Sequence, residues 1–228
     1  IRRPLSADQK RHFQTFGLIT LRQLLTPDEV TTLRQEYEAE LNRVYAHAPF
    51  DGSSRHWAMM LSERTPLFAS LLEDKRFYGV AEQLYGEDAV GMQTDANRYV
   101  SDTSWHPDHS ADPDKDVLGV KFAIYLDPVG ADNGALRIIP GSHRHRHRLH
   151  NIPLEEALVA EDGHPALQED KDEVDVPVKA GDLVIGDDRL LHAAHPNTSK
   201  QPRTVLTLWF CPTYDELPEN IQAIYGSH

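Results

Sequence analysis

The sequence predicts a mainly β protein, a sandwich or jelly roll that N-terminal helices support. Helix start and stop signals fill residues 1–87, whereas short apolar segments separated by turn-forming residues fill residues 88–212. The chain has 228 residues, a length at which all-β barrels and sandwiches commonly form one domain. We therefore expect a single domain over residues 1–228, with a C-terminal tail at residues 213–228.

Capping signals predict the first two helices. Ser6 and Gln9 suit a capping box, in which each side chain satisfies a free amide of the first turn, and Gly17 would end this helix. A short strand is expected over residues 18–24. Thr26, which a proline follows, then predicts the start of a second helix.

The second helix carries an apolar stripe that favours packing over cofactor binding. Its apolar residues recur at spacings of three and four, as one face of a helix requires. They are Val30, Leu33, Tyr37, Leu41 and Val44. We expect this face to lie against the body of the protein.

Helix signals continue as far as Gly86 and then largely stop. After a polar loop, Thr65 and Pro66 resemble another capped start, for a pair of helices that Gly86 ends. Strands are then expected at residues 89–100, 117–126, 135–139, 174–178, 183–185 and 203–211. Residues 150–173 are acidic and irregular, and we interpret them as a solvated excursion, with a mobile lid as the alternative.

Composition limits the kinds of partner. The chain has 23 Lys+Arg against 36 Asp+Glu and a formal charge of −13, which argues against duplex nucleic acid or an anionic membrane as the main partner. A small-molecule substrate fits better, and the oligomeric state is not indicated. The single cysteine, Cys211, excludes an intramolecular disulfide, and no apolar run approaches the roughly 18 residues of a membrane span. We therefore expect a cytoplasmic protein.

An imidazole and a carboxylate lie two positions apart just after the first long strand. In an extended segment, His106 and Asp108 would share one face. Such a pair can supply two neighbouring metal ligands, and a distant histidine can complete the two-His, one-carboxylate set of non-haem Fe(II) oxygenases. His192 is the best candidate for this third ligand, with His195 as its competitor. His109 competes with His106, but a histidine next to Asp108 would point to the opposite face of a strand. On its own, the pair favours the simpler interpretation of a surface histidine beside a turn aspartate.

Three motif blocks in a fixed order strengthen the metal interpretation. They read WHPD from residue 105, NGALRIIPGSH from residue 133 and HAAHPN from residue 192, and Arg203 lies 11 residues after His192. Together they resemble the phytanoyl-CoA dioxygenase family of Fe(II)/2-oxoglutarate-dependent oxygenases. The resemblance extends over roughly residues 10–210 and implies a double-stranded β-helix, the cupin-like form of the jelly roll.

The resemblance also implies a reaction and a set of site residues. It implies a hydroxylase that uses Fe(II), 2-oxoglutarate and O2 on a small molecule and releases succinate and CO2. His106, Asp108 and His192 would be the catalytic metal ligands. Arg203 would bind the far carboxylate of 2-oxoglutarate, because a guanidinium offers two parallel donors. Ala194 departs from the pattern, since some members have a serine there that helps to hold this carboxylate.

Other polar residues have weaker assignments. Gln93, Asn97 and Tyr99 share a parity on the preceding strand, so they could reach the cofactor, although ordinary lining of the barrel suits each of them equally. The alternating His and Arg residues at 143–148 are not expected to hold a metal, because the cations would repel it. A contact with an anionic substrate is the alternative there.

Two other classes of function compete with the hydroxylase. A cupin-type dioxygenase or isomerase without 2-oxoglutarate would favour a ligand set richer in histidine and would give Arg203 no task. A non-enzymatic metal-binding scaffold would be expected to have lost the triad or the arginine. Halogenation is disfavoured because Asp108 is present where halogenases have a small residue. The sequence does not identify the substrate.

Overall fold

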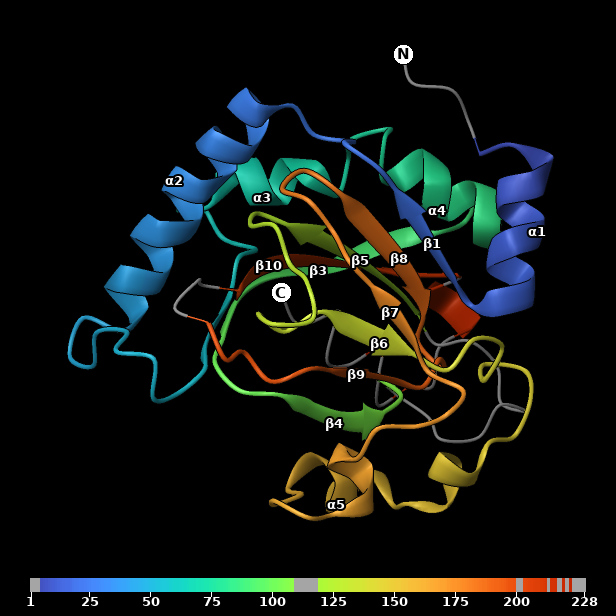
Figure 1. Cartoon of the computed structure of the whole chain (residues 1–228). Helices are drawn as coiled ribbons and strands as arrows, with labels where there is room; N and C mark the ends of the chain where they lie inside the picture. Colours follow the sequence, from blue (N-terminus) through green and yellow to red (C-terminus); the bar gives the residue numbers. More distant parts are fainter. Residues whose placement is uncertain are drawn as a thin grey trace.

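Two antiparallel β-sheets face each other in this computed structural model, and helices cover the outer face of the larger sheet (Figure 1). The structure describes residues 5–108, 119–199, 203–212, 214–216, 219 and 222. In chain order, with η for a 3-10 helix, its elements are α1 (Ala7–Phe16), β1 (Leu18–Leu21), α2 (Pro27–Val44), β2 (His56–Met59), α3 (Pro66–Leu71), α4 (Tyr78–Tyr85), β3 (Val90–Tyr99), β4 (Thr103–His106), β5 (Val120–Tyr125), β6 (Leu136–Ile138), η1 (Arg148–Asn151), α5 (Leu154–Leu158), η2 (Pro165–Leu167), β7 (Val174–Val176), β8 (Leu183–Asp187), β9 (His192–Ala194), β10 (Arg203–Cys211) and η3 (Tyr214–Glu216).

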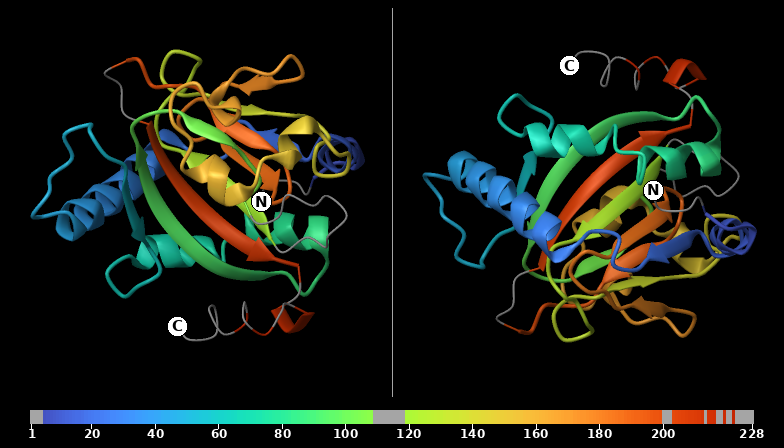
Figure 2. Two further views of the ribbon diagram at one scale, coloured as in Figure 1. Left: turned by 90° about the horizontal axis from the view of Figure 1, so that it is seen from below. Right: turned by 90° about the horizontal axis from the view of Figure 1, so that it is seen from above.

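The strand order confirms the predicted jelly roll. The larger sheet runs β1-β8-β5-β10-β3-β2 and the smaller one runs β4-β9-β6-β7, so most neighbours in space are distant in the sequence. The long strands β3 and β10 lie side by side and curve along their whole length (Figure 2). This curvature wraps the larger sheet around the space between the two sheets.

Alternation along β10 separates the main core from that space. Successive side chains of a strand point to opposite faces of its sheet. Leu206, Leu208 and Phe210 pack with the helices in the largest hydrophobic cluster. The intervening residues of the same strand line the space between the sheets, and they are Arg203, Val205, Thr207 and Trp209.

The N-terminal helices form largely as their local signals predict. Both capping boxes are present, at Ser6 of α1 and at Thr26 of α2, and Gly17 ends α1 with a left-handed conformation. The stripe of α2 is buried except at Val44, which is 44% exposed. Val44 is the last residue of α2, so the helix does not continue along the core beyond it.

Thr65 precedes α3 as predicted, but the prediction that its side chain caps this helix is wrong. The Thr65 hydroxyl donates to the carbonyl oxygen of Met60, at 2.6 Å, and makes no cap bond. The carboxylate of Glu36 from α2 accepts from the amide of Phe68 instead, at 3.0 Å. A tertiary contact therefore satisfies a free amide of this helix start.

The N-terminal region does more than support the sheet. β1 and β2 from this region join the larger sheet at its two edges. β1 ends at Leu21, earlier than predicted, and β2, β4 and β9 were not expected at all. A strand of three or four residues carries few alternations, so these three strands gave no clear signal in the sequence. The predicted tail lies mostly outside the described residues, and the single-domain organisation stays a prediction.

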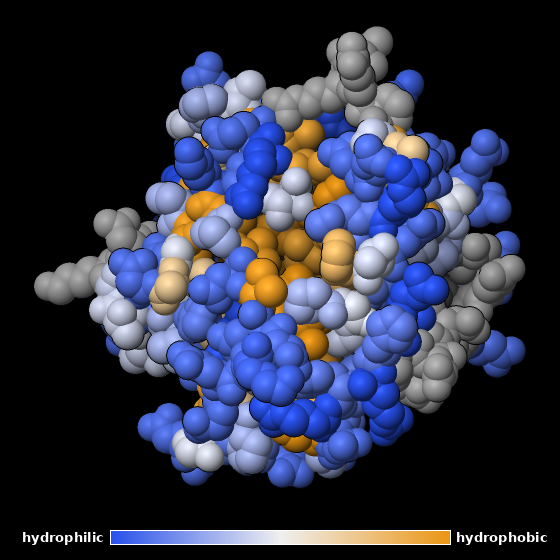
Figure 3. Space-filling view, turned by 45° about the vertical axis from the view of Figure 1, so that its right-hand side comes forward, coloured by the Kyte–Doolittle hydropathy of each residue, from blue (hydrophilic) through white to orange (hydrophobic). Residues whose placement is uncertain are grey.

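The outer surface is mostly hydrophilic on the face shown in Figure 3, where hydrophobic residues gather in a central hollow. Cys211 is buried and unpaired. Within the described part of the chain, no helix combines the length and the apolar character that a membrane span requires.

Candidate active site

The three predicted metal ligands converge at the smaller sheet. His106 ends β4 and lies directly opposite His192, the first residue of β9. Directly opposed residues on neighbouring strands project from the same face, and the two ring centres are 4.5 Å apart. Asp108 follows two residues later, and the candidate ligand atoms of all three residues lie within 4.8 Å of one another. The pairing of two short strands therefore assembles the group.

Backbone carbonyl groups orient both imidazoles. Nδ1 of His106 lies 2.6 Å from the carbonyl oxygen of Ser104, and Nδ1 of His192 lies 2.9 Å from that of Leu190. A proton on each Nδ1 satisfies these carbonyls and leaves the lone pair on Nε2. Metal-binding histidines are commonly held in this way.

The local environment keeps the imidazoles neutral and the carboxylate ionised. Burial and the neighbouring His192 lower the pKa of His106 to about 3. Burial also lowers the pKa of His192. At Asp108, burial opposes ionisation, but the Lys121 ammonium and the two imidazoles hold the pKa of the carboxyl below its ordinary value. Two neutral nitrogen donors and one carboxylate form a set that suits a divalent metal such as Fe(II).

These groups lie in a cavity of about 640 Å³ between the sheets, and Arg203 lines the same cavity. The Arg203 side chain is buried and donates from Nη1 to the carbonyl oxygen of Gly134, at 2.8 Å, and from Nη2 to that of Ser101, at 3.3 Å. Its guanidinium lies 4.5 Å from the centre of the Tyr99 ring. The structure thus brings the predicted anchor for 2-oxoglutarate and the candidate metal ligands into one cavity.

Gly134 explains why a glycine stands in the second motif block. Its φ angle of +92° is unfavourable for other residues, and a Cβ at this position would collide with the Arg203 guanidinium. Glycine is therefore needed for the backbone to approach Arg203 closely.

The three polar residues predicted from β3 all line the cavity but differ in their partners. Tyr99 stacks on Arg203, whereas Gln93 and Asn97 donate to the carboxylate of Asp95, at 3.3 and 2.5 Å. The alternation that points to Gln93, Asn97 and Tyr99 also includes Asp95, so the sequence carried a signal for this residue.

Two indoles complete the surroundings of Asp95. Trp57 of β2 donates from Nε1 to Oδ1 of Asp95, at 3.1 Å, and Trp209 of β10 donates to Oδ2, at 3.3 Å. Asp95 is only 4% exposed. Because β2 was not predicted, the contribution of Trp57 could not be foreseen.

Comparison with known proteins decides the family. The sequence profile described as phytanoyl-CoA dioxygenase matches residues 13–205, which is most of the chain. The chain belongs to the phytanoyl-CoA dioxygenase family.

Curated relatives in this family include ectoine dioxygenases. The protein of that name from Streptomyces anulatus is 29% identical over 62% of this chain and 52% of its own length. The one from Halomonas elongata is 27% identical over 88% of this chain and 68% of its own length. The chain thus spans about half the length of the first of these relatives.

Solved structures show the same fold. EctD from S. alaskensis, with bound Fe, has a TM-score of 0.71 and 26% identity, with 93% of this chain and 78% of that chain covered. HygX from Streptomyces hygroscopicus, with nickel and 2-oxoglutarate bound, has a TM-score of 0.73 at 20% identity and covers 92% of this chain and 88% of its own.

The P-G-S-H turn of the family motif holds the start of β9. The Ser142 hydroxyl accepts from the amide of Leu191, at 2.9 Å, directly before His192. His143 is buried, and its Nε2 lies 3.2 Å from the carbonyl oxygen of Gln14 in α1. This turn therefore helps to fix the position of His192, and His143 does not join the candidate ligands.

Ala194 departs from the family pattern, and other hydroxyls line the cavity. Ala194 lies opposite Thr103 in the pairing of β4 with β9, and Thr103 lines the cavity. Tyr125 lines it too, and burial raises the pKa of Tyr125 to about 12, so that its hydroxyl keeps its proton. Both hydroxyls can donate a hydrogen bond in the cavity.

The acidic excursion, residues 150–173, forms part of the cavity wall. Four of its apolar residues line the cavity, and they are Ala157, Leu158, Ala160 and Leu167. Most of the excursion is exposed, as predicted, but this part of it also contributes apolar side chains to the cavity wall.

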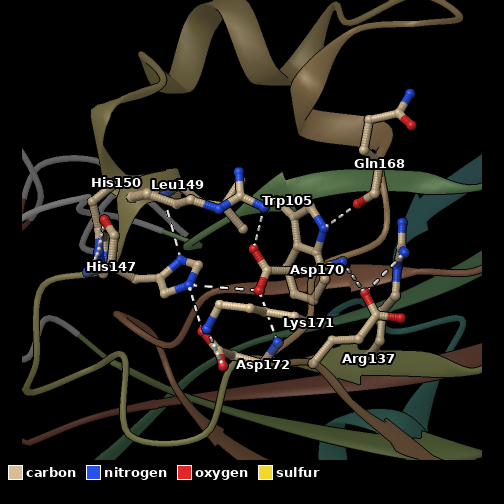
Figure 4. A network of polar contacts seen from close by, with 11 residues as sticks. Trp105, Arg137, His147, Leu149, His150, Gln168, Asp170, Lys171 and Asp172 are labelled. Atoms are coloured by element: carbon tan, nitrogen blue, oxygen red, sulfur yellow. Dashed lines mark hydrogen bonds and ion pairs between the residues drawn. The ribbon is translucent and has the colours of Figure 1, made fainter.

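Buried polar contacts attach this excursion to the smaller sheet (Figure 4). Nε1 of Trp105 donates to the carbonyl oxygen of Gln168, at 2.8 Å, and Nη2 of Arg137 donates to that of Leu167, at 3.1 Å. Trp105 directly precedes His106, so the first motif block joins the excursion to the candidate metal site.

The alternating His and Arg residues at 143–148 also help to attach the excursion. Arg148 forms an ion pair with the buried carboxylate of Asp170, at 2.5 Å. Nε2 of His147 approaches Asp170 and Asp172, at 3.7 and 3.6 Å. His147, Asp170 and Asp172 could hold a metal by distance alone, but the Arg148 guanidinium opposes a cation there.

The structure tests one of the two competing histidines. Nε2 of His195 lies 2.7 Å from Oδ1 of Asp175, and His195 is not in the group with His106. His109 lies outside the described residues.

Proposed function

We propose that this chain is an Fe(II)/2-oxoglutarate-dependent dioxygenase that hydroxylates a small molecule and releases succinate and CO2. The observation that carries the proposal is the convergence of His106, Asp108 and His192 in one cavity with Arg203. Membership of the phytanoyl-CoA dioxygenase family and relatives named ectoine dioxygenase support it.

In this proposal each residue has a defined task. His106, Asp108 and His192 hold Fe(II), and such a triad leaves three adjacent positions open for the other reactants. Bound iron together with 2-oxoglutarate would supply the activation of O2. Arg203 binds the far carboxylate of 2-oxoglutarate through paired N–H groups, and Tyr99 holds the guanidinium plane in place.

The remaining cavity wall would orient the substrate and exclude water. Apolar residues of the excursion line one part, and the Asp95 network lines another. This mixture suits a small polar molecule. Ectoine, which the names of the relatives contain, is the first candidate to test. The single buried Cys211 supports our proposal of a reducing, cytoplasmic location.

The decisive experiment measures succinate release from 2-oxoglutarate by anaerobically prepared, Fe(II)-loaded protein. A panel of small polar molecules that includes ectoine is supplied with O2, and succinate is compared with oxidised product. We expect equal amounts of both with the true substrate. Oxidised product without succinate would contradict the proposal and favour the cupin-type alternative.

Replacement of Arg203 by alanine should raise the apparent KM for 2-oxoglutarate roughly 30-fold or more, because the far carboxylate would lose a buried, charged partner. Steady-state kinetics with 2-oxoglutarate as the varied substrate measure this change. Metal binding should survive, and Arg203→Lys should fall between alanine and wild type because it keeps the charge and loses the paired donors. An unchanged KM in Arg203→Ala would show that another cation binds the far carboxylate of 2-oxoglutarate, and Lys121 would be the next residue to test.

A further inference from the structure

The candidate metal ligand Asp108 already has a cationic partner from the opposite sheet. Nζ of Lys121, on β5 of the larger sheet, lies 2.7 Å from Oδ1 of Asp108. The same Oδ1 is 3.7 Å from Nε2 of His192. The ammonium therefore contacts the carboxylate oxygen that faces the imidazole, on the side where a shared metal ion would bind.

This position makes Lys121 a competitor for a metal. A divalent cation on Asp108 would lie within a few ångströms of the ammonium, and unit charges at such distances repel strongly inside a protein. Both side chains are largely buried, at 22% and 12% exposed, so water screens this repulsion poorly. Metal binding is therefore favoured only if Lys121 gives up Asp108.

Asp95 offers a second partner in the same cavity. Both residues line the cavity from the larger sheet, and β10 runs between their strands. Trp209 of β10 links them, since its ring centre is 5.2 Å from Nζ of Lys121 and its Nε1 donates to Asp95. The lysine side chain is long and flexible, with its charge at the tip, so it can change partner without a movement of the sheet.

The surroundings of Asp95 leave it in need of a cation. Among the described residues, the side chains that donate to its carboxylate are neutral, and they belong to Trp57, Gln93, Asn97 and Trp209. Within the described ranges, Asp95 forms no ion pair, although it is only 4% exposed. Buried carboxylates are normally paired with a cation or a metal.

We propose that Lys121 is a resident counter-ion that competes with the metal for Asp108, and that Asp95 accepts its ammonium when the metal binds. The inference rests on the proposed function, because it requires metal binding by Asp108. It assigns to Lys121 and Asp95 a positioning role that sets the metal affinity of the site.

Direct binding of Mn(II) to the metal-free protein at one fixed pH tests the competition. Calorimetry, with electron paramagnetic resonance of free Mn(II) as a second readout, should show roughly tenfold or more tighter binding by Lys121→Met, since a repelling charge is gone. Lys121→Arg keeps the charge and should show no gain. Unchanged or weaker binding by a folded Lys121→Met protein would overturn the proposal, and Lys121→Gln repeats the test should the methionine variant unfold.

A double-mutant cycle tests the role of Asp95. Asp95→Asn should weaken Mn(II) binding roughly threefold to tenfold while Lys121 is present, because the ammonium then stays on Asp108. In the Lys121→Met background, Asp95→Asn should change the affinity for Mn(II) by less than about twofold. An equal loss in both backgrounds would show that Asp95 acts without the lysine.

The same measurements separate this inference from the proposed function. Mn(II) binding that His106→Ala does not weaken would contradict the proposed metal site and the inference with it. Binding that requires His106 but ignores Lys121 would overturn the inference alone.

Discussion

Replacement of His192 by alanine should abolish tight binding of Fe(II) and, with it, all turnover of 2-oxoglutarate. The structure places His192 opposite His106 with both rings oriented by carbonyl groups, so each imidazole would supply one of three protein ligands. The loss of affinity should exceed the roughly 10- to 100-fold that loss of an outer-shell partner costs. Anaerobic titration with Fe(II), and the visible charge-transfer band that forms with 2-oxoglutarate, measure the effect. His106→Ala should behave in the same way.

His195→Ala is the matched control for this prediction. It removes an imidazole from the same stretch of chain, but the structure pairs that imidazole with Asp175 and keeps it out of the ligand group. We expect normal iron affinity in His195→Ala. If this variant loses iron while His192→Ala retains it, the third ligand has been assigned to the wrong histidine.

Replacement of Asp108 by glycine should eliminate hydroxylation and weaken iron retention together. Asp108 is the carboxylate of the ligand group, so glycine removes both a coordinating atom and a negative charge. It also removes the ion-pair partner of Lys121. Succinate and oxidised product, measured beside wild type, should both fall by more than roughly 100-fold.

Asp102→Asn provides a comparison for this variant, because Asp102 is another carboxylate that lines the cavity. It should retain iron, since Asp102 is not in the group with His106 and His192. Substantial turnover by Asp108→Gly, especially turnover that does not need 2-oxoglutarate, would refute the triad and favour the cupin-type reading. Such a result would also remove the basis for the roles of Arg203 and Lys121.

Local features of the fold were predictable because neighbouring residues determine them. Capping boxes at Ser6 and Thr26 join atoms three residues apart, so the sequence contains all their parts. The strand over residues 203–211 has nine residues with apolar side chains at alternate positions, and its bounds match the structure. The short strands β2, β4 and β9 and the cap of α3 by Glu36 depend on distant partners and were missed.

The sequence by itself determined the family, the jelly roll and the identities of the candidate ligands. The motif blocks can be read from the order and spacing of their residues, and this does not depend on how the intervening segments fold. Only the tertiary structure decided which groups surround those ligands. The pairing of β4 with β9 brings His106 to His192, and the facing of the two sheets brings Lys121 to Asp108. These contacts join residues that are not related by the period of a helix or a strand, so no pattern in the sequence predicts them. They arise because the two sheets pack face to face.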